Sequence, residues 1–195
     1  MKFPYSKHAT SLLSGLKGVE IGGAAHNPFG LDTINVDRFA PDFPDFQIYA
    51  QEQTRLCGEV MPIDVVACGD DLPFDDKSFD FVISSHVIEH FFDPIAALME
   101  WRRVARKYIY IICPQRDALP SDRDKPLTTI ADLILRRLTG DNSEMTDEHH
   151  SRWTSKTFVQ MCRYWSFEVI DVLDPDDKVG NGFTVVIDAT KYRHD

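Results

Sequence analysis

The stretch CGDDLPFDDKSFDFVISSHVIEH, residues 68–90, contains Phe81-Val82-Ile83, an apolar run without polar alternation. Farther along the chain, Ile109-Tyr110-Ile111-Ile112 has the same character. Runs of this kind are typical of strands that are buried on both faces of a parallel sheet. We therefore expect both runs to be interior strands of an α/β sheet.

Strands and helices are expected to alternate along most of the chain. Asp93 and Pro94 form a helix start signal, an N-cap followed by proline at the first helical position. Thr154 likewise precedes apolar residues at helical spacing. The alternation predicts an α/β, Rossmann-like, doubly wound and mostly parallel sheet of about seven strands. The predicted strands are Val19–Ile21, Ile34–Val36, Ile63–Cys68, Phe79–Ser84, Tyr108–Cys113, Phe167–Leu173 and Phe183–Ala189.

The alternation breaks near the end of the chain. The last two predicted strands are joined only by DPDDKVGNG, which is too short for a crossover helix. The last strand should therefore be antiparallel. The polar segment Pro114–His150, after the fifth strand, is interpreted as a lid-like insertion in a single domain that spans residues 1–195. It should hold one helix, Thr128–Leu138, whose inward-facing residues are Ile130, Leu133, Ile134 and Leu138.

Composition narrows the functional class. The 195 residues suit one domain, and their net charge of −10 argues against tight binding to nucleic acid phosphates. The cluster Arg102, Arg103, Arg106 and Lys107 could form a local basic patch, although a helix C-terminus attracts cations in any case. The chain has no apolar run of membrane-spanning length and no secretory signal, so we expect a soluble cytoplasmic protein without integral membrane association.

The four cysteines indicate a reducing compartment. They lie far apart and form no C-x-x-C pair, which argues against a disulfide framework and a cysteine-based zinc site. Cys68, Cys113 and Cys162 fall inside apolar segments and are expected to be core thiols.

A glycine turn follows the first predicted strand, and an acid ends the second. Asp37 stands where a carboxylate accepts hydrogen bonds from a ribose diol. A dinucleotide turn reads G-x-G-x-x-G, but counting from Gly22 its later glycine positions hold Ala24 and Asn27. Pro28 and Gly30 also interrupt the helix that would face a pyrophosphate. The turn therefore favours S-adenosylmethionine over a dinucleotide, with a turn that binds no ligand as the alternative.

The central block closely resembles the small class I methyltransferases. Their pattern reads LPF-x-D-x-SFD-x-V, followed after two or three variable residues by a V-L-E-H-like run. Leu72–Val82 matches the first part at the same spacing, and Val87-Ile88-Glu89-His90 follows as the second part. The resemblance covers roughly Gly18–Pro114. It implies an S-adenosylmethionine-dependent methyltransferase, with S-adenosylmethionine as the cofactor.

The resemblance also implies a set of site residues. The acid and the glycine turn, Glu20, Gly22 and Gly23, would hold the methionine end of the cofactor, and Asp37 the ribose. The segment before and within LPF would contact the adenine, through Gly69, Asp70 and Leu72. Ser85 and His86 would face the methyl group.

Three features bear on this assignment. The family usually has an acid where this chain has Cys68. The family's glycine turn also contains more glycines than the turn of this chain. The stretch Glu20–Asp37, an E-x-G turn followed by Asn27-Pro28 and a later acid, also resembles a subset of methyltransferases that modify sugars or surface glycans. The expected methyl acceptor is therefore a small molecule or a saccharide, and an oxygen nucleophile.

The histidines allow further interpretations. His86 to His90 matches H-x-x-E-H, the zinc signature of inverzincin proteases, but it directly follows a buried strand instead of lying within a helix. A metal site from Asp147, His149 and His150 has no spacing rule to support it, so no metal is predicted. A hydroxyl nucleophile would benefit from a neutral histidine as general base, and His86, His90, His149 and His150 are the candidates.

Two other functions stay open on sequence alone. One is a cofactor-binding pseudoenzyme or regulatory subunit, supported by Cys68 and the weak glycine turn. The other is a nicotinamide-dependent oxidoreductase.

Overall fold

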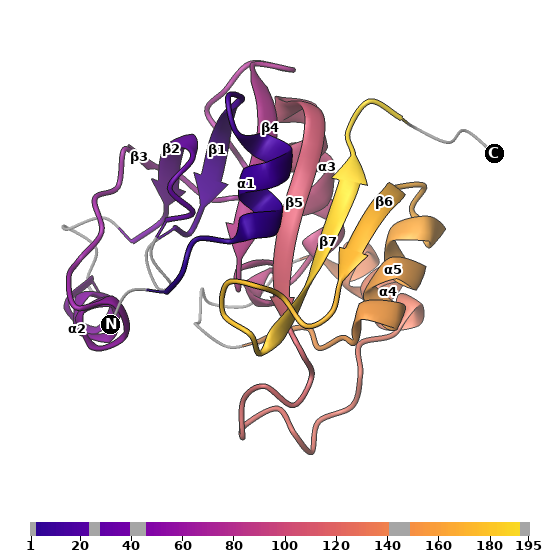
Figure 1. Cartoon of the computed structure of the whole chain (residues 1–195). Helices are drawn as coiled ribbons and strands as arrows, with labels where there is room; N and C mark the ends of the chain where they lie inside the picture. Colours follow the sequence, from indigo (N-terminus) through magenta and orange to yellow (C-terminus); the bar gives the residue numbers. More distant parts are fainter. Residues whose placement is uncertain (1–2, 24–27, 40–45, 141–148, 192–195) are drawn as a thin grey trace.

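The computed structural model describes residues 3–23, 28–39, 46–140 and 149–191. Its centre is one seven-stranded sheet with the order β3-β2-β1-β4-β5-β7-β6 (Figure 1). The strands are β1 Lys17–Ile21, β2 Asp32–Asp37, β3 Val65–Val66, β4 Phe79–Ser85, β5 Ala105–Pro114, β6 Glu168–Leu173 and β7 Gly182–Asp188.

The pairing confirms the predicted topology. Strand β1 runs parallel to β2 and β4, β2 to β3, and β4 to β5. Strand β7 is antiparallel to both β5 and β6. The short connection after β6 is the physical reason, because a parallel neighbour needs a crossover of a dozen or more residues.

Helices cover both faces of the sheet (Figure 1). On one face, Ala9 and Leu13 of α1 pack with Phe81 and Tyr110 of the strands. On the other face, α3 and α5 pack against alternate strand residues such as Val82. The helices are α1 Lys7–Leu13, α2 Phe46–Cys57, the 3-10 turn η1 Ile88–His90, α3 Pro94–Val104, α4 Ile130–Thr139 and α5 Ser155–Tyr164.

The predicted central strands and helix starts are confirmed. Phe81, Val82 and Ile83 are 0% exposed, as strands covered on both faces require. The Asp93 carboxylate accepts hydrogen bonds from the backbone N–H groups at the start of α3, which has proline at its first position. Thr154 begins α5 with a reciprocal capping box.

Two details of the predictions around β3 are wrong. The predicted strand Ile63–Cys68 shortens to Val65–Val66, because it lies at the edge of the sheet and pairs only with the end of β2. Cys68 is half-buried, whereas Cys57 is buried. Cys68 follows the short β3 and so lies outside the interior of the sheet.

The inward face of α4 is also only partly as predicted. Leu133 is buried, but Ile134 and Leu138 are 37% and 79% exposed. Helix α4 is held by charged groups as well as by Leu133: Arg137 binds the Asp93 carboxylate at 2.9 Å, and Arg136 donates to the His150 carbonyl at 2.7 Å. Within the part of the chain that the structure describes, no helix has the length and apolarity needed to cross a membrane.

Candidate functional site

Three segments that are distant in sequence meet where β1, β2 and β3 end. The Gly22 N–H donates to the Val36 carbonyl at 2.8 Å, which joins the glycine turn to β2. The Ala67 N–H donates to the Asp37 carbonyl at 3.2 Å, which joins the segment before Gly69 to the same strand. Gly69 packs so closely that a Cβ there would lie 2.9 Å from the Ile21 side chain. The three segments that contain the predicted cofactor ligands therefore converge at the carboxyl ends of β1, β2 and β3.

The first glycine of the turn is required by its backbone. Gly22 has φ +66°, and a Cβ there would lie 2.6 Å from the Val87 side chain. The next N–H, of Gly23, donates to the Asn35 side-chain oxygen at 3.1 Å. Asn35 was not predicted as a site residue, and the position of this amide between the apolar residues Ile34 and Val36 is the signal that could have identified it. Ala24 and Asn27 lie outside the described residues.

Glu20 lies beneath the turn. Its side chain is 1% exposed and accepts hydrogen bonds from the Phe29 N–H at 3.1 and 3.2 Å and from the Thr33 hydroxyl at 3.2 Å. A Cβ on Gly23 would lie 2.8 Å from the carboxylate. These contacts hold the Glu20 carboxylate against Gly23 of the turn. Direct contact between Glu20 and a cofactor stays a prediction.

Burial changes the ionisation of Glu20. It raises the pKa of the carboxyl to about 7, although the hydrogen bond from Phe29 and the nearby Lys178 ammonium act in the opposite direction. Lys178 is itself buried, and burial lowers its pKa to about 8 while the charge of Glu20 opposes that shift. The buried carboxyl of Glu20 beside the turn and the buried ammonium of Lys178 therefore both have pKa values near neutral pH.

Because of this shift, we expect the stability of the protein to fall between about pH 4.5 and pH 7. In that range the unfolded chain releases the Glu20 proton while the folded chain keeps it, so the free energy of unfolding decreases, by up to about 3 kcal/mol. Glu20→Gln should remove this component of the slope. Urea unfolding of the wild type and the variant at pH 5 and pH 8 measures the difference. Asp75→Asn, at an exposed carboxylate, is the control, and identical slopes in wild type and Glu20→Gln would contradict the prediction.

Asp37 ends β2 at the edge where the segments converge. Its side chain is 6% exposed, and one carboxylate oxygen accepts a hydrogen bond from the Phe39 N–H at 3.0 Å. That bond fixes the direction of the carboxylate. A carboxylate held in this way suits the hydroxyl groups of a ribose.

The predicted adenine segment is held by α3. The Trp101 indole N–H donates to the Gly69 carbonyl at 2.7 Å, and the Leu72 N–H donates to Glu100 at 2.9 Å. Arg103 donates to the Leu72 carbonyl at 3.1 Å and is paired with Glu100. Asp70, between these anchored residues, is exposed. The loop backbone is therefore fixed, and Asp70 is left at the surface of the site.

Cys68 introduces this segment in place of the family's usual acid. Burial and the neighbouring Asp70 carboxylate raise the pKa of its thiol, against the opposing charge of Arg38. The thiol therefore stays protonated and neutral near pH 7. The thiol therefore does not supply the negative charge of the acid that the family usually has at this position. The neighbouring acids are Asp70 and Asp71.

Ser85 is the last residue of β4, and His86 follows it. Ser85 is 8% exposed, and the His86 N–H donates to the Ile112 carbonyl of the neighbouring strand at 2.9 Å. His86 has φ +57°, an uncommon conformation that turns the chain sharply out of the sheet. The next residues form the short 3-10 turn η1, so His86 and His90 do not share a helix. The helical geometry of an inverzincin site is absent.

The two adjacent histidines at the end of the insertion have different surroundings. The His149 Nδ1 lies 2.5 Å from an Asp122 oxygen, and its Nε2 lies 3.8 Å from Glu89. The ring also stacks edge-on with His90, at 4.7 Å between centroids. The His150 ring instead packs on Phe92. Sequence order alone did not separate these roles.

Asp122 is the anchor of His149. It is 4% exposed and accepts a hydrogen bond from the Arg152 guanidinium at 2.7 Å. Burial alone would raise the pKa of Asp122, but the hydrogen bonds and charges of Arg152 and His149 outweigh it and lower the pKa below its ordinary value. The carboxylate is therefore ionised at neutral pH and orients the imidazole. Neither Asp122 nor Arg152 was predicted as part of a site.

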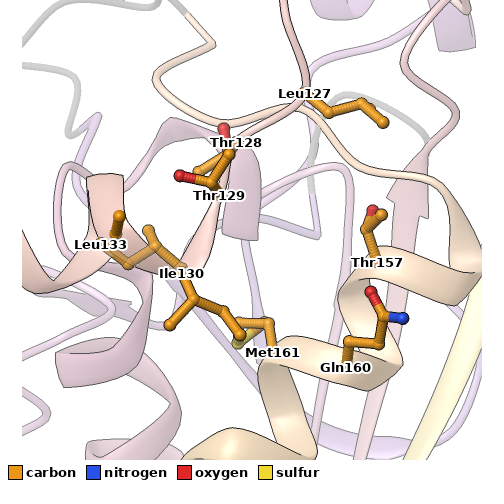
Figure 2. Close-up of a pocket in the computed structure, with 9 residues that line it drawn as sticks. Leu127, Thr128, Thr129, Ile130, Leu133, Thr157, Gln160 and Met161 are labelled. Carbon is orange, nitrogen blue, oxygen red and sulfur yellow. The ribbon is translucent and has the colours of Figure 1, made fainter.

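A separate hollow of about 430 Å³ lies between α4 and α5 (Figure 2). Its walls are hydrophobic and hydroxyl side chains from both helices and the segment before α4, including Thr128, Ile130, Thr157 and Met161. It contains no charged side chain. Thr128 also hydrogen-bonds the Arg152 backbone, so the hollow adjoins the segment that carries His149.

The strand order and the position of the converging segments define the architecture of class I methyltransferases. Solved structures that share this fold include the following two. The methyltransferase in a complex with the Trm112 methyltransferase activator of Haloferax volcanii has a TM-score of 0.55 and 18% identity, over 97% of this chain and 90% of that one. An S-adenosylmethionine-dependent methyltransferase of Aquifex aeolicus has a TM-score of 0.53 and 15% identity, over 95% and 90% of the two chains.

Sequence comparison agrees with the fold. Residues 39–113 match a family model described as a methyltransferase domain. An uncharacterized methyltransferase of Schizosaccharomyces pombe is 44% identical over 48 residues, which is 25% of this chain. The match spans only 17% of the length of that relative. Residues 39–113 are therefore similar to a methyltransferase domain, and the chain has the fold of solved S-adenosylmethionine-dependent methyltransferases.

Proposed function

We propose that this protein transfers the methyl group of S-adenosylmethionine to an oxygen of a small molecule or saccharide. The observation that carries the proposal is the convergence of the glycine turn, Asp37 and the anchored segment 69–72 at one edge of the sheet. These are the three elements that hold an adenosyl group in such enzymes. The donor set fits the ligand, since the described residues of the three segments offer the backbone amides and carboxylates that an uncharged adenosyl group and a methionine end can use.

Each element has a distinct part in binding. Asp37 would accept hydrogen bonds from the ribose, and Gly22 and Gly23 would lie along the methionine end, with Glu20 supporting the turn. Gly69, Asp70 and Leu72 would face the adenine. Ser85 and His86 would lie nearest to the methyl group, because β4 ends beside β1 at the point where the strand order reverses.

Catalysis would depend mainly on positioning. When bound, S-adenosylmethionine supplies a methyl group that is already activated by its sulfonium. Holding the acceptor in line with that methyl group is worth on the order of 7–11 kcal/mol, whereas a general base adds about 3–5 kcal/mol. Of the candidate histidines, His86 is nearest to the end of β4, and His149 is oriented by the Asp122 carboxylate. The packing of the His150 ring on Phe92 makes it the weakest candidate.

Two features support the proposed class of methyl acceptor. The similarity of the turn sequence around Gly22 and Pro28 to sugar-modifying enzymes is the reason to test saccharides first. The hollow between α4 and α5 has walls without charge, which suit a neutral acceptor (Figure 2).

Calorimetry and turnover together test the proposed function. We expect the purified protein to bind S-adenosylmethionine and S-adenosylhomocysteine with one site per chain, and not to bind NADH. Release of S-adenosylhomocysteine should then be measured with a panel of saccharides and hydroxylated metabolites. Binding without turnover on any acceptor would support the pseudoenzyme, and NADH binding alone would support an oxidoreductase.

A further inference from the structure

We propose that Glu89, His90 and His149 form a binding site for a divalent first-row transition metal ion. One donor atom from each of the three side chains lies within 4.8 Å of the other two. The Glu89 oxygen lies 3.8 Å from the Nε2 atoms of both histidines. Glu89 and His90 are brought to His149 by the fold alone, because 58 residues lie between His90 and His149 in the chain.

The spacing is close to that of a metal site. Ligand atoms of a tetrahedral zinc ion stand about 3.4 Å apart, given metal–ligand distances near 2.1 Å. Small rotations of the three side chains would bring the present separations to that value. The two imidazole rings lie at 80° to each other, with their centroids 4.7 Å apart. Two imidazoles and one carboxylate are a donor set that suits zinc and iron(II), and leave coordination positions open.

The surroundings of His149 support this assignment. A histidine that binds a metal through one ring nitrogen almost always donates the other N–H to a carboxylate or carbonyl. His149 has this arrangement, with Nδ1 on Asp122 and Nε2 toward Glu89. Arg152 in turn holds Asp122 at 2.7 Å. The chain Arg152–Asp122–His149 fixes the tautomer that leaves Nε2 available as a ligand.

The backbone around the cluster is also tied together. The Ser151 N–H donates to the Glu89 carbonyl at 3.1 Å, and Arg136 of α4 donates to the Ser151 hydroxyl at 2.8 Å. Glu89 itself is 0% exposed. A bound metal ion would place positive charge beside this buried carboxylate, and so would a protonated imidazole of His90 or His149. These are the two outcomes that an experiment must separate.

The site lies just past the end of β4, close in sequence to Ser85 and His86, which are proposed to lie nearest to the methyl group. An ion there would use its open positions to bind and orient oxygen donors of the methyl acceptor. This part of the inference rests on the proposed function. Binding of the metal itself does not.

Titration of the chelator-treated protein with Zn²⁺ and Co²⁺ tests the site. We expect one Zn²⁺ per chain by calorimetry, and visible Co²⁺ absorption typical of nitrogen and oxygen ligands without a thiolate band. Glu89→Gln and His149→Ala should each weaken binding at least about 100-fold. Asp122→Asn should weaken it about 10- to 100-fold, because it removes only the orienting partner. His150→Ala, at the adjacent histidine outside the cluster, is the matched control and should bind metal as the wild type does.

Two results would contradict the proposed metal site. One is the absence of stoichiometric binding by the wild type. The other is wild-type affinity in both Glu89→Gln and His149→Ala. Thermal unfolding followed by circular dichroism verifies that each variant is folded. S-adenosylmethionine binding is measured in parallel on the metal-free protein, so a failure of the proposed function is seen separately from a failure of the metal site.

Discussion

Trp101→Ala is expected to lower the free energy of unfolding by about 4–6 kcal/mol, the largest stability effect of a single substitution considered for this chain. The side chain is 0% exposed and packs in the core on the α3 face of the sheet. Truncating a buried tryptophan costs about 3–5 kcal/mol through lost contacts and the cavity left behind. The Gly69 carbonyl would also lose the indole N–H as its donor. Urea unfolding measures the change.

Trp101→Phe separates the two contributions. It keeps most of the ring volume but removes the hydrogen bond to Gly69, so it should cost only about 1–3 kcal/mol. Because that bond positions the proposed adenine segment, we also expect the folded Phe variant to bind S-adenosylmethionine more weakly than the wild type. Equal unfolding free energies of the Ala variant and the wild type would contradict the packing argument. Unchanged cofactor affinity in the Phe variant would contradict the positioning argument.

Asp37→Ala is expected to have the largest effect on cofactor affinity, weakening S-adenosylmethionine binding about 10- to 100-fold. A hydrogen bond to a charged group contributes about 1.5–3 kcal/mol, and the side chain at the end of β2 is already oriented by the Phe39 N–H. Asp37→Asn keeps the shape and one acceptor oxygen, so its loss should be smaller. Isothermal titration calorimetry measures both affinities.

Asp32→Ala provides the matched control for Asp37. Asp32 is an exposed acid at the opposite end of the same strand, away from the edge where the three segments meet. Its removal changes the net charge of the protein by the same amount but should leave affinity unchanged. Equal losses in the two variants would mean that overall charge, and not the proposed ribose contact, governs binding.

Local sequence signals predicted most of the fold because they act over a few residues. The uninterrupted apolar run Phe81–Ile83 needs no distant partner to be identified as a buried strand, and the caps at Asp93 and Thr154 depend only on the next three residues. The apolar side of α4 was misjudged for the opposite reason. Which of its apolar residues are covered depends on Arg136 and Arg137, whose partners belong to other parts of the chain.

The proposed cofactor site was predictable in part. The resemblance of the central block pointed to Asp37 and Gly69, and the structure brings both to one edge of the sheet. The supporting residues Asn35 and Trp101 were not predicted, since neither belongs to a recognisable motif. Their importance comes from hydrogen bonds to the turn and to the adenine segment.

By itself, the sequence determined the α/β class, the antiparallel final strand and the kind of ligand that the first turn favours. These depend on periodicity, loop length and the residues of one turn, all of which are local. Only the tertiary structure decided that Glu89, His90 and His149 share one cluster, with Asp122 behind His149 and His150 turned away onto Phe92. The physical reason is that side-chain donors converge through the order of the strands and the path of the insertion, and no spacing along the chain encodes that convergence.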